Sequence, residues 1–135
     1  MELIYKLSEL EKASNFVLKN VSRDIILISG EVGTGKTTLI KEYCKLIGVE
    51  EIVNSPTYTL INEYQNMRRK IVHMDLYRVK DINEINELGL FEYLENNIVI
   101  IEWPEIILKM IDIKYSLINI TFINERERKL SIKNL

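Results

Sequence analysis

The segment GEVGTGKT, residues 30 to 37, constrains the fold of this chain more than any other part of it. It follows the apolar run IILIS, which is typical of a strand buried on both faces, and it precedes a stretch with helical periodicity. Glycines let the backbone curl so that successive amides point at phosphate oxygens, and the N-terminus of the next helix adds partial positive charge. The spacing G-x-x-x-x-G-K-T between a strand and a helix therefore predicts a phosphate-binding P-loop.

Each residue type in this loop has an expected task. The ammonium group of Lys36 should contact the β- and γ-phosphates of a nucleotide, and the hydroxyl of Thr37 should ligate Mg²⁺. Backbone amides of the loop would bind the remaining phosphate oxygens. The residues expected to contact the nucleotide are Glu31, Val32, Gly33, Thr34, Gly35, Lys36, Thr37 and Thr38.

Two acids follow apolar runs that read as strands. Asp75 comes after IVHM and Glu102 comes after IVII, so each could reach the sheet edge at which open α/β folds bind ligands. A P-loop requires such an acid to hold Mg²⁺, directly or through water. For either acid taken alone, an ordinary exposed carboxylate at a strand end is the alternative.

Three other polar or aromatic residues stand near these motifs. Thr57 follows Pro56 in a loop, and its hydroxyl either senses the γ-phosphate through Mg²⁺, as switch loops do, or only shapes the turn. His73 is expected to be a structural hydrogen-bonding residue, and Trp103 a partly buried aromatic residue. Alternation along the strand places His73 and Asp75 on the same face.

The remaining pattern predicts one domain, residues 1–135, with an α/β architecture. Ser8 and Glu11 fit a capping box at the start of a helix. Helices are expected over 8–20, 37–47, 81–96 with a break at Gly89, and from Pro104 to about Met110; strands are expected over 24–30, 59–65, 70–79, 97–104, 115–123 and 128–134. The fold class predicted is a three-layer sandwich of the P-loop NTPase kind, whose central mixed sheet includes antiparallel hairpins.

Composition excludes several classes of function. The formal net charge of −2 offers no basic excess for gripping nucleic-acid phosphates, so any link to RNA should be indirect. The single cysteine, Cys44, excludes an internal disulfide and multi-cysteine metal sites, and its helical context predicts a buried core thiol. No export signal or 18-residue apolar window is present, so we expect a cytoplasmic protein without a membrane span.

Missing motifs narrow the choice among P-loop proteins. There is no N-K-x-D tetrapeptide and no D-x-x-G after the loop, which disfavours a GTPase. The chain is too short for a helicase core. A small-molecule kinase remains open, although few arginines are available to grip a second phosphorylated substrate.

Four segments together resemble one family closely. GEVGTGKTT, SPTYTLINEY, HMDLYR and ELGLFEYLENNIVIIEWPE, in this order, are similar to the bacterial TsaE family, formerly YjeE, over roughly residues 8 to 130. The resemblance implies an ATPase of tRNA threonylcarbamoyladenosine synthesis that uses ATP and Mg²⁺. It further implies a protein that is monomeric alone, partners TsaD and TsaB, and meets tRNA only through that complex.

The resemblance also implies roles for matching residues. Lys36 and Thr37 carry over as phosphate and Mg²⁺ residues, and Thr57 as the switch-loop threonine. Asp75 and Glu102 carry over as the acidic pair, with Asp75 expected on the Mg²⁺ side and Glu102 expected to orient the attacking water. These residues form the expected catalytic set, namely Lys36, Thr57, Asp75 and Glu102, and the metal set, namely Thr37, Asp75 and Glu102.

Other roles stay open at this point. Trp103 is expected to be a functional neighbour of the site, and Arg78 is the nearest candidate for an internal arginine finger, with packing or partner contact as its alternatives. Besides the partner-activated ATPase, two hypotheses for the function remain: a small-molecule kinase and a nucleotide-gated binding module without appreciable turnover.

Overall fold

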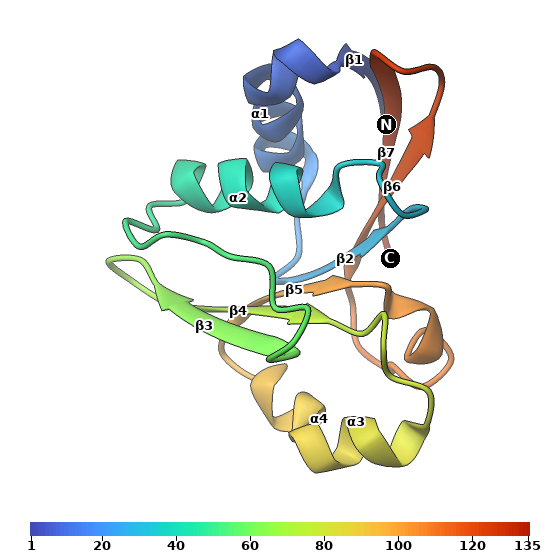
Figure 1. Cartoon of the computed structure of the whole chain (residues 1–135). Coiled ribbons are helices and arrows are strands. Elements are labelled where there is room, and N and C mark those ends of the chain that lie inside the picture. Colours follow the sequence, from blue (N-terminus) through green and yellow to red (C-terminus); the bar gives the residue numbers. More distant parts are fainter.

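A single seven-stranded mixed sheet organises the computed structural model, which describes all 135 residues (Figure 1). Its strands stand in the order β1-β7-β6-β2-β5-β4-β3. The central strands β6, β2, β5 and β4 run parallel to one another, whereas β1, β7 and β3 pair antiparallel with their neighbours. The strands are β1 Glu2–Lys6, β2 Ile25–Ser29, β3 Ile61–Gln65, β4 Lys70–Asp75, β5 Ile98–Glu102, β6 Ser116–Phe122 and β7 Glu127–Asn134.

Helices cover both faces of this sheet. One face carries α1 (Leu10–Asn20) and α2 (Lys36–Leu46), and the other carries α3 (Ile82–Leu88) and α4 (Leu90–Tyr93) (Figure 1). Short 3₁₀ turns, η1 (Leu7–Glu9) and η2 (Pro104–Ile106), complete the elements. The predicted α/β sandwich is confirmed. None of the helices is long and apolar enough to cross a bilayer.

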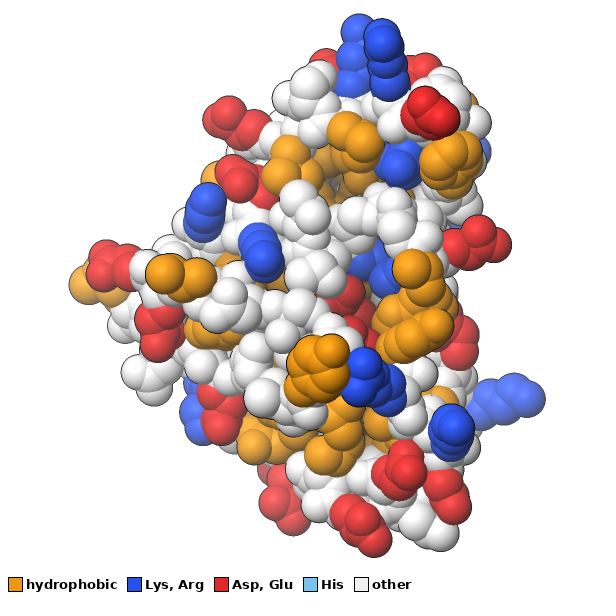
Figure 2. Space-filling view, viewed as in Figure 1, with side chains coloured by type: hydrophobic (Ala, Val, Ile, Leu, Met, Phe, Trp, Pro, Cys, Tyr) orange, Lys and Arg blue, Asp and Glu red, His pale blue; other side chains and the backbone are white.

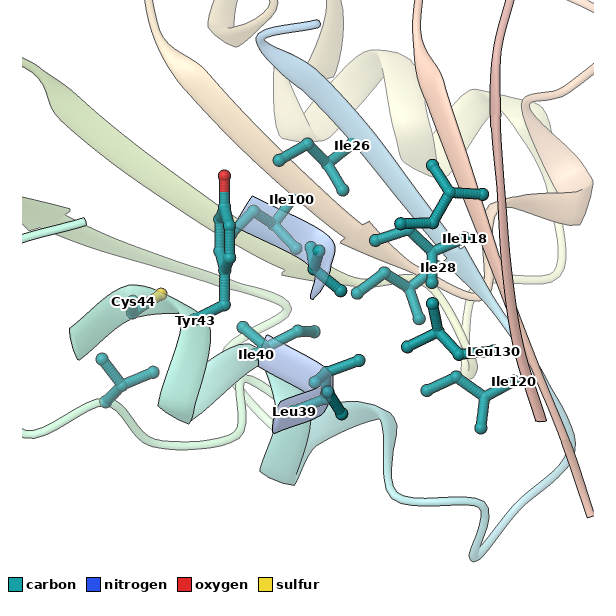
Figure 3. Close-up of a cluster of buried hydrophobic side chains, with 14 of the residues drawn as sticks. Ile26, Ile28, Leu39, Ile40, Tyr43, Cys44, Ile100, Ile118, Ile120 and Leu130 are labelled. Carbon is teal, nitrogen blue, oxygen red and sulfur yellow. The ribbon is translucent and has the colours of Figure 1, made fainter. Parts of the chain in front are cut away.

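The two faces of the sheet bury separate apolar clusters. The cluster under α1 and α2 includes Ile26, Ile28, Leu39, Ile40, Tyr43, Cys44, Ile100, Ile118, Ile120 and Leu130 (Figure 3). The opposite cluster includes Leu27, Met74, Leu90, Ile101 and Ile107. Because β2 and β5 contribute to both clusters, they read in the sequence as continuous apolar runs.

Cys44 lies in the first cluster and is fully buried. Burial raises the pKa of its thiol to about 12, because the thiolate would lose its hydration. The thiol therefore stays protonated at neutral pH, and the expectation of a core cysteine is confirmed.

Several predicted boundaries need correction. The strand expected over 70–79 ends at Asp75, because the chain then enters a turn in which the amide of Val79 bonds to the carbonyl of Leu76. The helix expected to reach Met110 is helical only over η2, and turns continue the chain. The capping box of Ser8 and Glu11 is wrong: Glu9 accepts a hydrogen bond from the amide of Lys6 at 2.9 Å instead.

The strand β1 is absent from the prediction. It lies at the edge of the sheet and pairs with β7, and only Tyr5 among its five residues is buried. A short edge strand with one buried side chain leaves little periodic signal.

Candidate phosphate-binding site

The predicted P-loop connects the end of β2 to the start of α2. Gly33 and Gly35 have φ angles of 81° and 97°, a region that side chains rarely adopt. A Cβ on Gly30 would lie 2.7 Å from the carbonyl oxygen of Ile120 in the neighbouring strand β6. Backbone conformation and close packing thus account for the glycines of the motif.

Lys36 is buried at the first turn of α2, with 5% of the residue exposed. Its ammonium group donates hydrogen bonds to the carbonyls of Gly30 and Glu31, and it lies 4.1 Å from the ring centroid of Trp103. Burial lowers the pKa of Lys36, and the charges of Glu102 and Asp75 oppose this shift. Lys36 is therefore a partly desolvated cation at the P-loop. Its attraction for a bound anion is stronger there than it would be in bulk water, because the surroundings screen the charge less.

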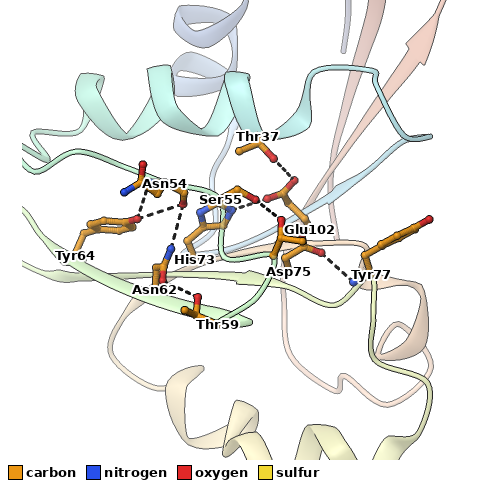
Figure 4. A network of polar contacts seen from close by, with 11 residues as sticks. Thr37, Asn54, Ser55, Thr59, Asn62, Tyr64, His73, Asp75, Tyr77 and Glu102 are labelled. Carbon is orange, nitrogen blue, oxygen red and sulfur yellow. Dashed lines mark hydrogen bonds and ion pairs between the residues drawn. The ribbon is translucent and has the colours of Figure 1, made fainter.

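The two predicted acids lie side by side. β4 and β5 are parallel, and their register pairs Asp75 with Glu102 at the ends of both strands. The hydroxyl of Thr37 donates to Oε1 of Glu102 at 2.8 Å, and Nε2 of His73 lies 2.7 Å from Oε2 (Figure 4). Both carboxylate oxygens of Glu102 are therefore engaged.

Asp75 is held differently. Its Oδ1 accepts the amide of Tyr77 at 2.9 Å, whereas Oδ2 makes no hydrogen bond within the protein. Burial raises the pKa of Asp75 and the nearby charge of Glu102 adds to this, against the lowering effect of the Tyr77 amide. The fold thus keeps a carboxylate with one free oxygen at a cost in stability.

We expect Asp75→Asn to stabilise the protein, because the amide keeps an acceptor for Tyr77 and removes a buried charge. The melting temperature at pH 7 should rise, by roughly 3 °C for each 1 kcal/mol that removal of the charge returns in a chain of this size. A pKa raised by folding means that ionised Asp75 disfavours the folded state, so protonation relieves the penalty and the gain should vanish below about pH 4. Asp112→Asn, at an exposed position, is the matched control. A lower melting temperature for Asp75→Asn would contradict this account of the acid.

A pocket of about 320 Å³ collects the predicted site residues. In the space-filling view, acidic and basic side chains meet in a hollow bordered by apolar ones (Figure 2). The lining residues are Val32, Gly33, Gly35, Lys36, Thr37, Thr38, Ser55, Thr57, Asp75, Tyr77, Glu102 and Trp103. Two residues predicted to contact the nucleotide lie outside this lining: Glu31 is exposed, and the buried hydroxyl of Thr34 donates to the carbonyl of Glu31.

The loop that carries Thr57 is tied down at both ends. The side chains of Asn62 and Tyr64 on β3 bond to the backbone of Asn54, and the amide of Leu60 bonds to the carbonyl of Pro56. Between these anchors, the hydroxyl of Thr57 bonds only to that of Ser55, at 2.6 Å. The middle of the loop thus presents a hydroxyl to the pocket.

The aromatic side chains of Tyr77 and Trp103 line part of the pocket. Trp103 adopts a φ of 56°, and its ring contacts the ammonium group of Lys36 and the ring of Tyr77, the latter at 4.7 Å between centroids. Arg78 stacks on the exposed ring of Tyr58 at 4.5 Å and does not line the pocket. Neither Ser55 nor Tyr77 was among the predicted site residues, because only the folded loops bring them to the pocket.

The oxygen ligands suit a hard divalent cation. The Thr37 hydroxyl and the carboxylates of Asp75 and Glu102 are the donor types that Mg²⁺ prefers. No group of three or more His, Cys, Asp or Glu side chains forms a metal site by itself. Mg²⁺ commonly takes its other ligands from phosphate and water, so the residues fit the ion expected with a nucleotide.

The chain matches a known family over most of its length. The model of the threonylcarbamoyl adenosine biosynthesis protein TsaE matches residues 4–130. The chain belongs to the TsaE family. This confirms the resemblance seen in the sequence motifs.

Two named TsaE relatives illustrate the extent of the similarity. The tRNA threonylcarbamoyladenosine biosynthesis protein TsaE of Rickettsia felis is 38% identical over 110 residues, which cover 81% of this chain and 64% of the relative. The protein of the same name from Bacillus subtilis is 40% identical over 85 residues, or 62% of this chain and 52% of the relative. The matches thus span between half and two thirds of these two relatives.

A solved structure supports the fold independently. The crystal structure of YdiB from Bacillus subtilis superposes with a TM-score of 0.74 and 24% identity, covering 98% of this chain and 84% of that one. The two proteins therefore share their overall fold.

Proposed function

We propose that this chain is the ATP-hydrolysing component of the tRNA threonylcarbamoyladenosine modification machinery, and that it acts in the cytoplasm with Mg²⁺ while docked on TsaD and TsaB. The observation that carries the proposal is the meeting of Lys36, Thr37, Asp75 and Glu102 in one pocket of a TsaE-family chain. The net charge of −2 favours contact with tRNA through the partners.

The contacts of the two acids suggest how their work is divided. Glu102 is bonded to Thr37, the residue expected to ligate Mg²⁺, so we assign Glu102 to the metal side. Asp75 keeps a free oxygen and a raised pKa, which suit a base that orients the attacking water. This division reverses the one expected from the sequence.

In hydrolysis, the protein mainly positions groups and stabilises charge. Lys36 and the loop amides would bind the β- and γ-phosphates, and Asp75 would hold the water in line. Bound Mg²⁺ would neutralise charge on the phosphate oxygens. Thr37 and Glu102 orient each other at the start of α2, so this side of the pocket is prepared before the reaction.

No arginine lines the pocket, and Arg78 is engaged with Tyr58. An arginine finger accelerates other P-loop enzymes by about 10³ to 10⁵. We therefore expect slow turnover by the isolated protein and activation when a partner supplies or orders a group at the γ-phosphate. The same lack of arginines disfavours a kinase, which would have to grip a second phosphorylated substrate.

The Thr57 loop is the proposed link between nucleotide and partner. If its hydroxyl responds to the γ-phosphate, the loop differs between ATP and ADP states, and partner affinity must differ by linkage. Binding to immobilised TsaD–TsaB should be stronger with a nonhydrolysable ATP analogue than with ADP, and Thr57→Ala should shrink this difference. Thr59→Ala, in the same loop but outside the pocket, is the control. Equal affinity in both nucleotide states would contradict partner gating.

A further inference from the structure

We propose that His73 is a positioning residue that holds the carboxylate of Glu102 toward Thr37. The inference rests on the proposed function, since it concerns the pocket that would bind Mg²⁺ and ATP. It adds a residue that touches none of the expected ligands. His73 does not line the pocket, and it acts through Glu102.

The contacts form a continuous path across three elements. His73 on β4 is fully buried, and Glu102 on β5 is 2% exposed. Nε2 of His73 lies 2.7 Å from Oε2 of Glu102, and the hydroxyl of Thr37 on α2 lies 2.8 Å from Oε1. Figure 4 shows the imidazole ring, the carboxylate and the threonine hydroxyl in this order. Each oxygen of the acid therefore has its own donor.

The other ring nitrogen indicates which tautomer is present. Nδ1 of His73 is buried and has no hydrogen-bond partner. A proton on Nδ1 would leave an unpaired buried N–H, which is costly, whereas an unprotonated Nδ1 leaves only an unused acceptor. We therefore assign the proton of this hydrogen bond to Nε2. His73 then donates to Oε2 of Glu102.

This donor restricts an otherwise flexible acid. The glutamate side chain rotates about three bonds, and Lys36 lies close enough for its charge to compete for the carboxylate. The bond from His73 satisfies Oε2 in the interior, so Oε1 is left to face Thr37. Without that bond, the carboxylate loses the contact that keeps it on the metal side, while Lys36 and the loop amides are unchanged. Loss of the His73 bond should therefore reduce the gain in nucleotide affinity that Mg²⁺ provides, without weakening nucleotide binding in the absence of Mg²⁺.

Two amide substitutions test the position of the donor. The side-chain nitrogen of Gln corresponds to Nε2 of the ring and that of Asn to Nδ1, so His73→Gln can reach Glu102 and His73→Asn cannot. The measurement is the affinity for a fluorescent ATP analogue, with Mg²⁺ and with EDTA. We expect wild type and His73→Gln to gain similarly from Mg²⁺. His73→Asn should lose roughly tenfold or more of that gain, the worth of one hydrogen bond to a charged group, and keep its affinity in EDTA.

A double-mutant cycle with Glu102→Gln supplies the second readout. If His73 acts through Glu102, His73→Asn should have no further effect on the Mg²⁺ gain once Glu102 is replaced. Equal losses in both amide variants, or an undiminished gain in His73→Asn, would overturn the proposal for His73. Absence of ATP-analogue binding by the wild type would instead overturn the proposed function. Thermal melting of each variant separates these results from loss of fold.

Discussion

Lys36→Ala is expected to weaken ATP binding by tenfold or more, which corresponds to about 1.4 kcal/mol. Lys36 is the one cation that lines the pocket, and its ammonium group is shielded from water by Trp103 and the loop carbonyls. A charge in such surroundings interacts with phosphate more strongly than a solvated one does. Titration with a fluorescent ATP analogue measures the change.

A matched control distinguishes the site from general electrostatics. Lys41 lies on the same helix, is exposed and does not line the pocket, so Lys41→Ala should leave the affinity nearly unchanged. Lys36→Ala should retain its fold, because Gly30 and Glu31, whose carbonyls lose the ammonium donor, are half-buried and exposed, so water can take its place. Unchanged affinity in a folded Lys36→Ala protein would refute the P-loop assignment.

Glu102→Gln should lower ATP hydrolysis by about 10- to 100-fold, the loss that typically follows removal of a group that orients a metal ligand. The amide keeps the shape of the side chain and an oxygen for His73, but it loses the negative charge beside Thr37. The variant should therefore bind the ATP analogue in EDTA like the wild type and gain little from Mg²⁺. Release of phosphate in the presence of TsaD and TsaB measures the rate.

The control acid for this substitution is close by in the sequence. Glu105 is exposed, bonds to Ser29 and lies outside the pocket lining, so Glu105→Gln should keep its activity. If Glu102→Gln keeps its Mg²⁺ gain but loses hydrolysis, Glu102 orients the water after all. The assignment drawn from the Thr37 contact would then be wrong.

Much of the fold could be predicted because its signals are local. The P-loop is contiguous, and the buried strands β2 and β5 carry apolar side chains to both faces, which makes them readable as uninterrupted runs. Asp75 and Glu102 were found because each directly follows such a run. Parallel strands bring their carboxyl ends to one edge, so their proximity followed from topology.

The contacts that assign roles could not be predicted because they depend on register and loop conformation. Residues 37 and 102 meet only once α2 is packed against the sheet, and residues 73 and 102 meet only in the observed pairing of β4 with β5. Trp103 has a positive φ, and its ring lies against Lys36. The residue type at position 103 does not indicate this backbone conformation. The acidic pair is therefore predictable from the sequence, whereas the division of work proposed for its members rests on contacts that form only in the folded chain.

Phosphate release on mixing the purified chain with TsaD and TsaB tests the central claim most directly. The proteins are assayed separately and together with ATP and Mg²⁺, and Glu102→Gln in the same mixture provides the blank. The proposed mechanism predicts slow release by the chain alone and a rise of tenfold or more on mixing, a small part of what a supplied arginine contributes elsewhere. Tight binding of ATP with no rise in phosphate release on mixing would contradict it and would leave a nucleotide-gated binding module.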